Sequence, residues 1–143
     1  MFRNPEPEAI ADLLKRTKTI AVLGLSPKPG RDSHHVAEEL QRFGYRIVPV
    51  RPAVDSILGE KAYSSLSAIP KSLLNEIDLV DVFRAPEHVP AIVGECLELG
   101  LKVLWLQLGI VHEAAAERAV KGGMTVVMDR CTYVDYRRLV GEN

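Results

Sequence analysis

Cysteine is nearly absent from this chain. Only Cys96 and Cys131 occur among its 143 residues. Two thiols are too few for the disulfide framework of a small secreted protein, and these two lie too far apart in the sequence for a Cys-x-x-Cys redox or metal motif. We therefore expect both cysteines to be reduced.

Long apolar runs are missing as well. No uninterrupted stretch approaches the roughly 18 apolar residues of a membrane-spanning helix. Residues 1–6, which read MFRNPE, lack the basic and then apolar layout of a secretory signal peptide. Together with the reduced cysteines, this predicts a cytoplasmic protein that does not bind membranes.

The chain has no excess of charge of one sign. It carries 18 lysines and arginines against 19 aspartates and glutamates, which gives a net charge of −1. Such a chain produces no general field that would attract nucleic acid, so nucleic acid is not an expected partner. An anionic ligand must instead be held by a local cluster of donors.

The remaining composition is that of a globular protein. Hydrophobic residues make up 47% of the chain and charged residues 26%, which gives no compositional reason for disorder. A length of 143 residues is close to the common size of one domain. We expect residues 1–143 to form a single domain, with residues 1–16 containing a helix packed on its sheet.

Short apolar runs alternate with amphipathic segments along the chain. Strands are predicted at residues 19–24, 45–50, 77–83, 102–107 and 124–128. Helices are predicted at residues 5–16, 33–43, 86–99, 111–121 and 133–140, with Asp32 or Ser33 as the N-cap of the second. Residues 51–76 are expected to be a loop with one helical turn near residues 66–69. This pattern predicts an α/β fold, a Rossmann-like doubly wound five-stranded parallel sheet with helices on both faces.

Ligands of such sheets bind beyond the carboxyl ends of the strands. The first strand is followed by a loop that contains Gly24, Ser26 and Arg31 and leads to Ser33 at the helix start. A glycine, two hydroxyls, a guanidinium and free helix N–H groups meet the requirements of a phosphate site. The loop is neither Gly-x-Gly-x-x-Gly nor a Walker A motif. The alternative is a glycine-proline turn that only connects a strand to a helix.

Arg51 follows the second strand and bears on the choice of ligand. A typical NAD site has Asp or Glu at this position, to accept hydrogen bonds from the ribose hydroxyls. A basic residue there suits a ribose phosphate, which leaves NADP and coenzyme A (CoA) as candidates. The alternative is a solvated surface arginine. After the fourth strand, Gln107 and Gly109 are further ligand candidates.

Five stretches at the strand ends together resemble one family. They read GLSP at 24–27, YRIVPVRP at 45–52, DVFR at 81–84, WLQLG at 105–109 and VMDRC at 127–131. From about residue 17 to residue 134, the chain resembles stand-alone CoA-binding domain proteins, which are related to the N-terminal domain of the succinyl-CoA synthetase α subunit. One position departs from the family, which usually has Gly-Ala-Ser where this chain has Gly24, Leu25 and Ser26.

The resemblance implies roles for particular residues in binding CoA. It places the CoA phosphates at the first loop and the adenosine part at the end of the second strand, with the pantetheine arm along the ends of the third and fourth strands. Carried over to this sequence, it implies phosphate contacts from Gly24, Leu25, Ser26, Arg31 and Ser33, a 3′-phosphate contact from Arg51, and groove contacts from Phe83, Arg84, Gln107 and Gly109.

No catalytic or metal-binding residues stand out. His34 and His35 are adjacent on a helix and therefore point apart, and no second ligand pair has suitable spacing. Arg130 is expected to lower the pKa of the Cys131 thiol, which raises the hypothesis of a mixed disulfide with the ligand thiol. Three functions remain open: a non-catalytic CoA or acyl-CoA binding module, a CoA-sensing subunit that acts through a protein partner or a homo-oligomer, and an NADP-dependent oxidoreductase. The last would need a substrate domain and a proton donor that the sequence does not reveal.

Overall fold

The fold is built on a five-stranded, wholly parallel sheet. The structure is a computed structural model that describes residues 1–141. The strands are β1 (Thr19–Leu23), β2 (Arg46–Val50), β5 (Leu79–Val82), β6 (Val103–Leu106) and β7 (Thr125–Met128). They lie in the order β2-β1-β5-β6-β7. All five strands are those predicted from the apolar runs, and the Rossmann-like fold is confirmed.

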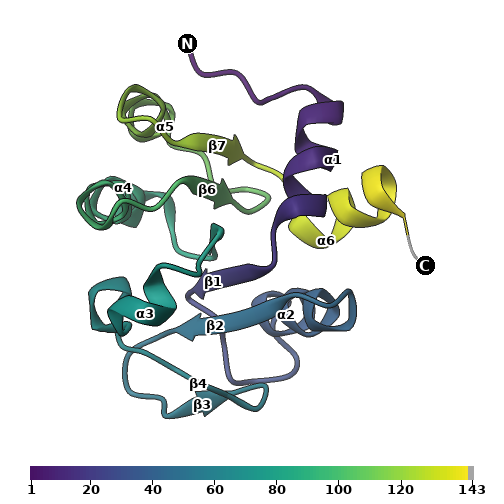
Figure 1. Ribbon diagram of the computed structural model, residues 1–143, viewed down its shortest axis with the longest axis vertical. Coiled ribbons are helices and arrows are strands. Elements are labelled where there is room, and N and C mark those ends of the chain that lie inside the picture. The colour runs from purple at the N-terminus through teal and green to yellow at the C-terminus, as the bar shows by residue number, and fades with distance from the viewer. Residues whose placement is uncertain (142–143) are drawn as a thin grey trace.

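Helices cover both faces of this sheet (Figure 1). On one face lie α1 (Pro7–Arg16), α2 (Asp32–Arg42) and α6 (Thr132–Asp135), and on the other lie α3 (Lys71–Leu74), α4 (Val89–Leu99) and α5 (Glu113–Lys121). Alternate residues of β1 serve the two cores: Ile20 and Val22 pack on the α1 and α2 side, whereas Ala21 and Leu23 pack on the α4 and α5 side. Within residues 1–141, no helix is long and apolar enough to cross a membrane.

The predicted loop at residues 51–76 contains more structure than expected. It holds a hairpin of β3 (Ser56–Ile57) and β4 (Glu60–Lys61) as well as the short helix α3. Strands of two residues are too short to show an alternating pattern, so no local pattern predicts them. The hairpin turns at Leu58 and Gly59, which both have positive φ, and the Gln41 side chain donates to the Leu58 carbonyl at 3.2 Å.

Several predicted helix boundaries shift by a few residues, as at α1, which begins at Pro7 where residue 5 was predicted. Two further shifts lie in the second half of the chain. The predicted helix at residues 111–121 begins at Glu113, because His112 is its N-cap and accepts from the Ala115 N–H at 3.1 Å. The last predicted helix begins one residue early, at Thr132, and continues after α6 as a π-helical turn over Tyr136–Val140. Neither change moves a strand end.

The strand order creates a crevice between the ends of β1 and β5. From β1 the chain passes to β2 at one edge of the sheet, then returns past β1 to form β5. The connections that leave β1 and β5 therefore diverge to opposite faces, which is where ligands bind in open α/β sheets. Gly24 and Phe83, the residues directly after these two strands, meet at this point.

The close contact between the segments after β1 and β5 requires a glycine at position 24. Its φ is +81°, and a Cβ atom there would lie 2.5 Å from the Phe83 carbonyl oxygen and 2.9 Å from the Arg84 Cδ. Both the backbone conformation and the contact exclude a larger side chain. Gly30, in the same loop, has no atom within 4 Å of the corresponding position.

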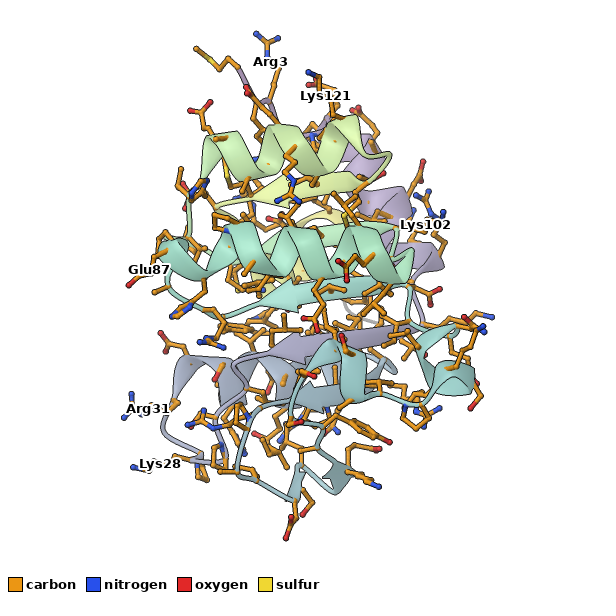
Figure 2. All side chains as sticks on the ribbon, turned by 90° about the vertical axis from the view of Figure 1, so that its left-hand side faces the viewer. Arg3, Lys28, Arg31, Glu87, Lys102 and Lys121 are labelled. Carbon is orange, nitrogen blue, oxygen red and sulfur yellow. The ribbon has the colours of Figure 1, made fainter. Side chains whose placement is uncertain are left out.

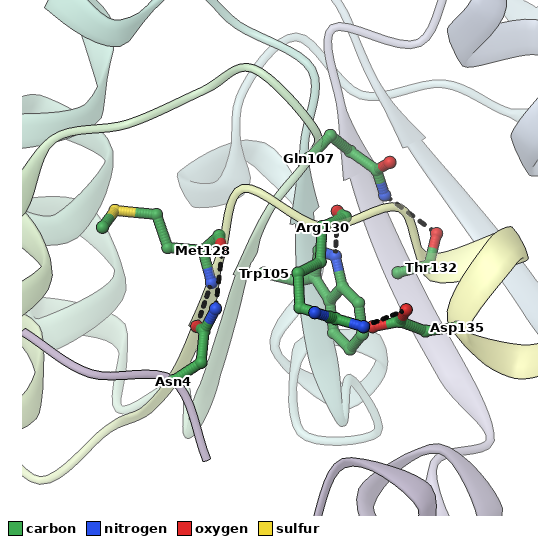
Figure 3. Close-up of polar contacts among 7 residues, drawn as sticks. All are labelled: Asn4, Trp105, Gln107, Met128, Arg130, Thr132 and Asp135. Atoms are coloured by element: carbon green, nitrogen blue, oxygen red, sulfur yellow. Dashed lines mark hydrogen bonds and ion pairs between the residues drawn. The ribbon is translucent and has the colours of Figure 1, made fainter. Parts of the chain in front are cut away.

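A buried polar cluster on the α6 side ties the sheet to the β7–α6 connection. Asp81 is fully buried and accepts from the Gln107 Nε2 at 2.6 Å and from the Thr132 hydroxyl at 3.1 Å. Gln107 also donates to the Thr132 Oγ1 at 2.8 Å, a contact drawn in Figure 3. Burial raises the pKa of Asp81 to about 7, although its two hydrogen bonds act in the opposite direction. The cluster fixes Thr132 at the first position of α6.

Further contacts hold the same connection in place (Figure 3). The Trp105 indole N–H donates to the Arg130 carbonyl at 2.7 Å, and the Arg130 guanidinium forms two hydrogen bonds to Asp135, at 2.6 and 2.8 Å. Asn4 exchanges two hydrogen bonds with the Met128 backbone, at 2.8 and 2.9 Å. The connection after β7 is thus held by side chains from β6, α6 and the N-terminal segment.

The first prediction concerns Gly24. Gly24→Ala should lower the free energy of unfolding by at least about 1–2 kcal/mol, because an L-residue is strained at positive φ and its Cβ would collide with the Phe83 backbone. Gly30→Ala is the matched control and should change stability by less than about 1 kcal/mol. Urea unfolding measures both; equal stabilities of the two variants would contradict the role assigned to Gly24.

The second prediction concerns Asp81. Because folding raises its pKa from 3.8 to about 7, the folded state holds this proton more tightly, so Asp81 destabilises the protein progressively as pH rises from about 4 to 7. Asp81→Asn should have little effect at pH 4 and be increasingly stabilising relative to wild type up to pH 8, by roughly 4 kcal/mol at most. Urea unfolding from pH 4 to 8 tests this. Asp12→Asn, on the exposed side of α1, is the control; a pH-independent difference at Asp81 would refute the assignment.

Candidate functional site

A continuous groove runs along the carboxyl ends of the strands. It consists of three adjoining cavities of about 410, 460 and 330 Å³. The first two share Gly24, Arg51 and Phe83, and the first and third share Asp32 and Phe83. We call this the strand-end groove. Phe83 lines all three cavities and stands at its middle.

Two serines organise the loop at the polar end of the groove. The Ser26 N–H donates to the Ser33 hydroxyl at 2.9 Å, and the Lys28 N–H donates to the Ser26 hydroxyl at 3.1 Å. Each hydroxyl oxygen therefore already accepts a bond that shapes the loop. Each retains its own O–H, which is free to donate to a ligand.

The start of α2 has no side-chain cap. We expected Asp32 or Ser33 to be the N-cap, and this is wrong: Arg31 occupies that position and makes no capping hydrogen bond. The Ser33 hydroxyl is used instead to hold Ser26. The first N–H groups of α2 thus have no side-chain acceptor, and Asp32 and Ser33 at this helix start line the groove beside the loop that connects β1 to α2. Such a helix start attracts anions.

Cations surround this end of the groove. Lys28 and Arg31 project from the loop at the edge of the molecule where the strands end (Figure 2), and neither forms an ion pair with any residue of the described part of the chain. Arg51 is half-buried and donates to the Leu25 carbonyl at 3.4 Å, while Arg84 lines the second cavity. The polar end can therefore accept more than one phosphate group.

The other end of the groove is largely apolar. The third cavity is lined chiefly by Val36, Phe83, Leu108, Ile110, Tyr133 and Val134. Its lining is completed by Asp32, His35, Gln107 and Cys131. An extended ligand with anionic groups at one end and an uncharged arm at the other would match both ends of the groove.

The structure brings most of the predicted site residues together. Those that line the groove are Gly24, Ser26, Arg31, Ser33, Arg51, Phe83, Arg84 and Gln107. Two do not line these cavities: Leu25 is fully buried in the core, and Gly109 lies exposed, its N–H donating to Asp129 at 2.6 Å. Gln107 is 3% exposed, and its amide nitrogen already donates to Asp81 and Thr132, so that nitrogen is not free to bind a ligand.

Several groove residues were not singled out from the sequence. Lys28 is one, although a lysine three residues from Arg31 in a turn was a usable signal. Ile110, Tyr133 and Val134 are others, and nothing in their local sequence sets them apart from core residues. Only the arrangement of the loop after β6 against α6 gives them a common cavity.

The expectation for the Cys131 thiol is wrong. Burial raises the pKa of Cys131 and outweighs the lowering effect of backbone hydrogen bonds from Val134 and Tyr133. Arg130, expected to lower it, points its guanidinium at Asp135 instead. Although Cys131 lines the groove, little of it is a thiolate at neutral pH, which disfavours a mixed disulfide with a ligand thiol.

A larger cavity, of about 620 Å³, lies elsewhere. It is formed by residues 1–3 against α5, with Glu117 and Lys121 among its lining residues. The N-terminal ammonium group is paired with Glu117 at 3.0 Å on this surface. This cavity lies on the outer side of a helix and receives no strand end, so the strand-end groove remains the candidate site.

Comparisons with known proteins agree with this geometry. A family described as the CoA binding domain matches residues 18–137. The chain is 44% identical to the uncharacterized protein YneT of Bacillus subtilis, over 93% of this chain and 96% of that protein. It is 31% identical to the α subunit of ADP-forming acetate–CoA ligase I of Pyrococcus furiosus, over 81% of this chain but only 28% of that subunit.

Solved structures have the same fold over nearly the whole chain. A hypothetical protein from Pyrococcus horikoshii superimposes with a TM-score of 0.89 and 34% identity, over 99% of each chain. A Thermus thermophilus protein superimposes with a TM-score of 0.86 and 35% identity, over 94% of this chain and 99% of that one. With the family match extending over most of the sheet, the chain belongs to the CoA binding domain family.

Proposed function

We propose that this protein binds coenzyme A or an acyl-CoA in the strand-end groove and acts as a binding or regulatory module without ligase activity of its own. The observation that carries the proposal is the continuity of the groove, in which the cationic loop after β1 and the apolar cavity beside α6 share Asp32 and Phe83. We further propose that residues 1–143 act as one domain. A cytoplasmic location stays a prediction.

The residues present fit the parts of CoA in order. The helix N–H groups of α2, the Ser26 and Ser33 hydroxyls, and Arg31 would hold the diphosphate. Arg51, anchored to the Leu25 carbonyl, would meet the 3′-phosphate. The pantetheine arm would pass Phe83 and enter the apolar cavity, where it leaves water. The bound thiol would supply the acyl-carrying chemistry of CoA, while the protein binds and orients it.

A ligase reaction by this chain alone is not part of the proposal. The chain spans 28% of the length of the acetate–CoA ligase α subunit that it resembles, so most of that subunit has no counterpart here. That relative is a subunit of a larger assembly, which supports a role in which the CoA-bound domain is recognised by a protein partner or a second copy. The ligand would then serve as a signal.

The identity of the ligand is tested by isothermal titration calorimetry of the purified protein with CoA, acetyl-CoA, NADP and NAD. We expect CoA and acetyl-CoA to bind, since each carries a 3′-phosphate and an uncharged arm that match the two ends of the groove. NADP has phosphates for the polar end but a charged ring in place of the arm, so it should bind more weakly, and NAD more weakly still. Tight NADP binding without CoA binding would favour the oxidoreductase alternative.

The phosphate contact is tested by Arg31→Ala. Loss of a charge-assisted hydrogen bond should weaken CoA binding by about 1.5–3 kcal/mol, while Arg31 is exposed and its removal should leave stability unchanged. Arg3→Ala is the matched control, because Arg3 is also exposed but lies far from the groove (Figure 2). Calorimetry gives the affinities; equal CoA affinity in wild type and Arg31→Ala would remove Arg31 from the site.

A further inference from the structure

The two ends of the strand-end groove fix the direction of the ligand. Every lysine and arginine that lines it belongs to the first two cavities, at the loop after β1 and at the exits of β2 and β5. Phosphates belong at that end by charge. The far end of the pantetheine arm, which carries the thiol or the acyl group, must therefore reach the third cavity.

That third cavity is an apolar surface open to solvent. Leu108 and Val134 line it while remaining 71% and 43% exposed, which are unusual values for large apolar side chains in this protein. Ile110, Val36 and Phe83 add further apolar area, and the volume is about 330 Å³. An apolar group bound here would bury its own surface and would also shield the exposed Leu108 and Val134 side chains from water.

The charges around this cavity oppose an anionic occupant. No lysine or arginine of the described residues lines it, and the carboxylate at its border is Asp32. On the α6 side, the Arg130 guanidinium is paired with Asp135, and Arg137 does not line the cavity but donates to the hydroxyl of the lining residue Tyr133 at 3.0 Å. His35 also lines the cavity, with its ring edge-on to Tyr133 and 5.5 Å between the ring centroids.

We infer that the groove selects acyl-CoAs whose acyl group is short, uncharged and apolar, and rejects those that end in a carboxylate. This inference rests on the proposed function and makes it more specific, because it names the acyl class that the third cavity accepts. A carboxylate bound there would lose water without gaining a lysine or arginine partner from the lining, and Asp32 would repel it. Burying a methyl group in the same place would gain affinity.

The decisive comparison is between butyryl-CoA and succinyl-CoA, which have acyl chains of equal length and differ in a terminal methyl or carboxylate. Calorimetry at pH 8 measures both affinities. Each buried methylene should tighten Kd about fourfold, and butyryl-CoA has two more methylenes than acetyl-CoA, so it should bind about fifteenfold tighter. Succinyl-CoA should bind at least about tenfold more weakly than butyryl-CoA.

A variant then tests whether the third cavity is the source of this selectivity. Val134→Lys places an ammonium group in its wall and should tighten succinyl-CoA and weaken butyryl-CoA, while circular dichroism and urea unfolding check that the variant is folded. Val120→Lys is the matched control: Val120 is 49% exposed on α5, outside the groove, and its substitution should leave all the affinities unchanged.

The outcomes separate this inference from the proposed function. If CoA itself does not bind, the proposed function fails. If CoA binds but succinyl-CoA matches or exceeds butyryl-CoA in the wild-type protein, the selectivity is refuted while the binding site stands. If CoA binds and no acyl-CoA does, the cavity accepts only the free thiol, which also refutes the inference. The wild-type comparison decides even if Val134→Lys does not fold.

Discussion

The site depends on the close approach of two backbone segments where β1 and β5 end. Gly24 lies against the Phe83 carbonyl so tightly that no side chain fits between them. This contact brings the loop after β1 against the exit of β5, and the polar and apolar parts of the groove adjoin at Phe83. A larger residue at position 24 would require one of the two segments to move.

The polar end of the groove is preorganised by groups that remain able to bind. The Ser26 and Ser33 hydroxyls accept bonds from backbone N–H groups and so define the loop, yet each keeps an O–H to donate. The absence of a side-chain cap on α2 leaves its helix dipole directed at the groove. Donors arranged in this way before binding reduce the entropy lost when an anion is held.

The position of the apolar end depends on the buried carboxyl group of Asp81, whose burial costs folding free energy. It holds Gln107 and Thr132, and through Thr132 it fixes the start of α6, the helix that carries Tyr133 and Val134 into the groove. A fully buried carboxylate destabilises the fold unless its hydrogen bonds compensate. The same hydrogen bonds hold Thr132, and with it the start of α6, in one position over the sheet.

The sequence by itself determined the five strands, the order of helices and strands, and most of the polar end. Those features depend on local patterns: apolar runs, the glycine at 24, and serines and cations within one loop. Only the tertiary structure decided the rest. The apolar cavity joins residues from α2, the loop after β6 and α6, and the Cys131 pKa follows from burial and from the pairing of Arg130 with Asp135. Neither burial nor contacts between distant segments are encoded in any local pattern, because both arise only when the sheet and its helices pack.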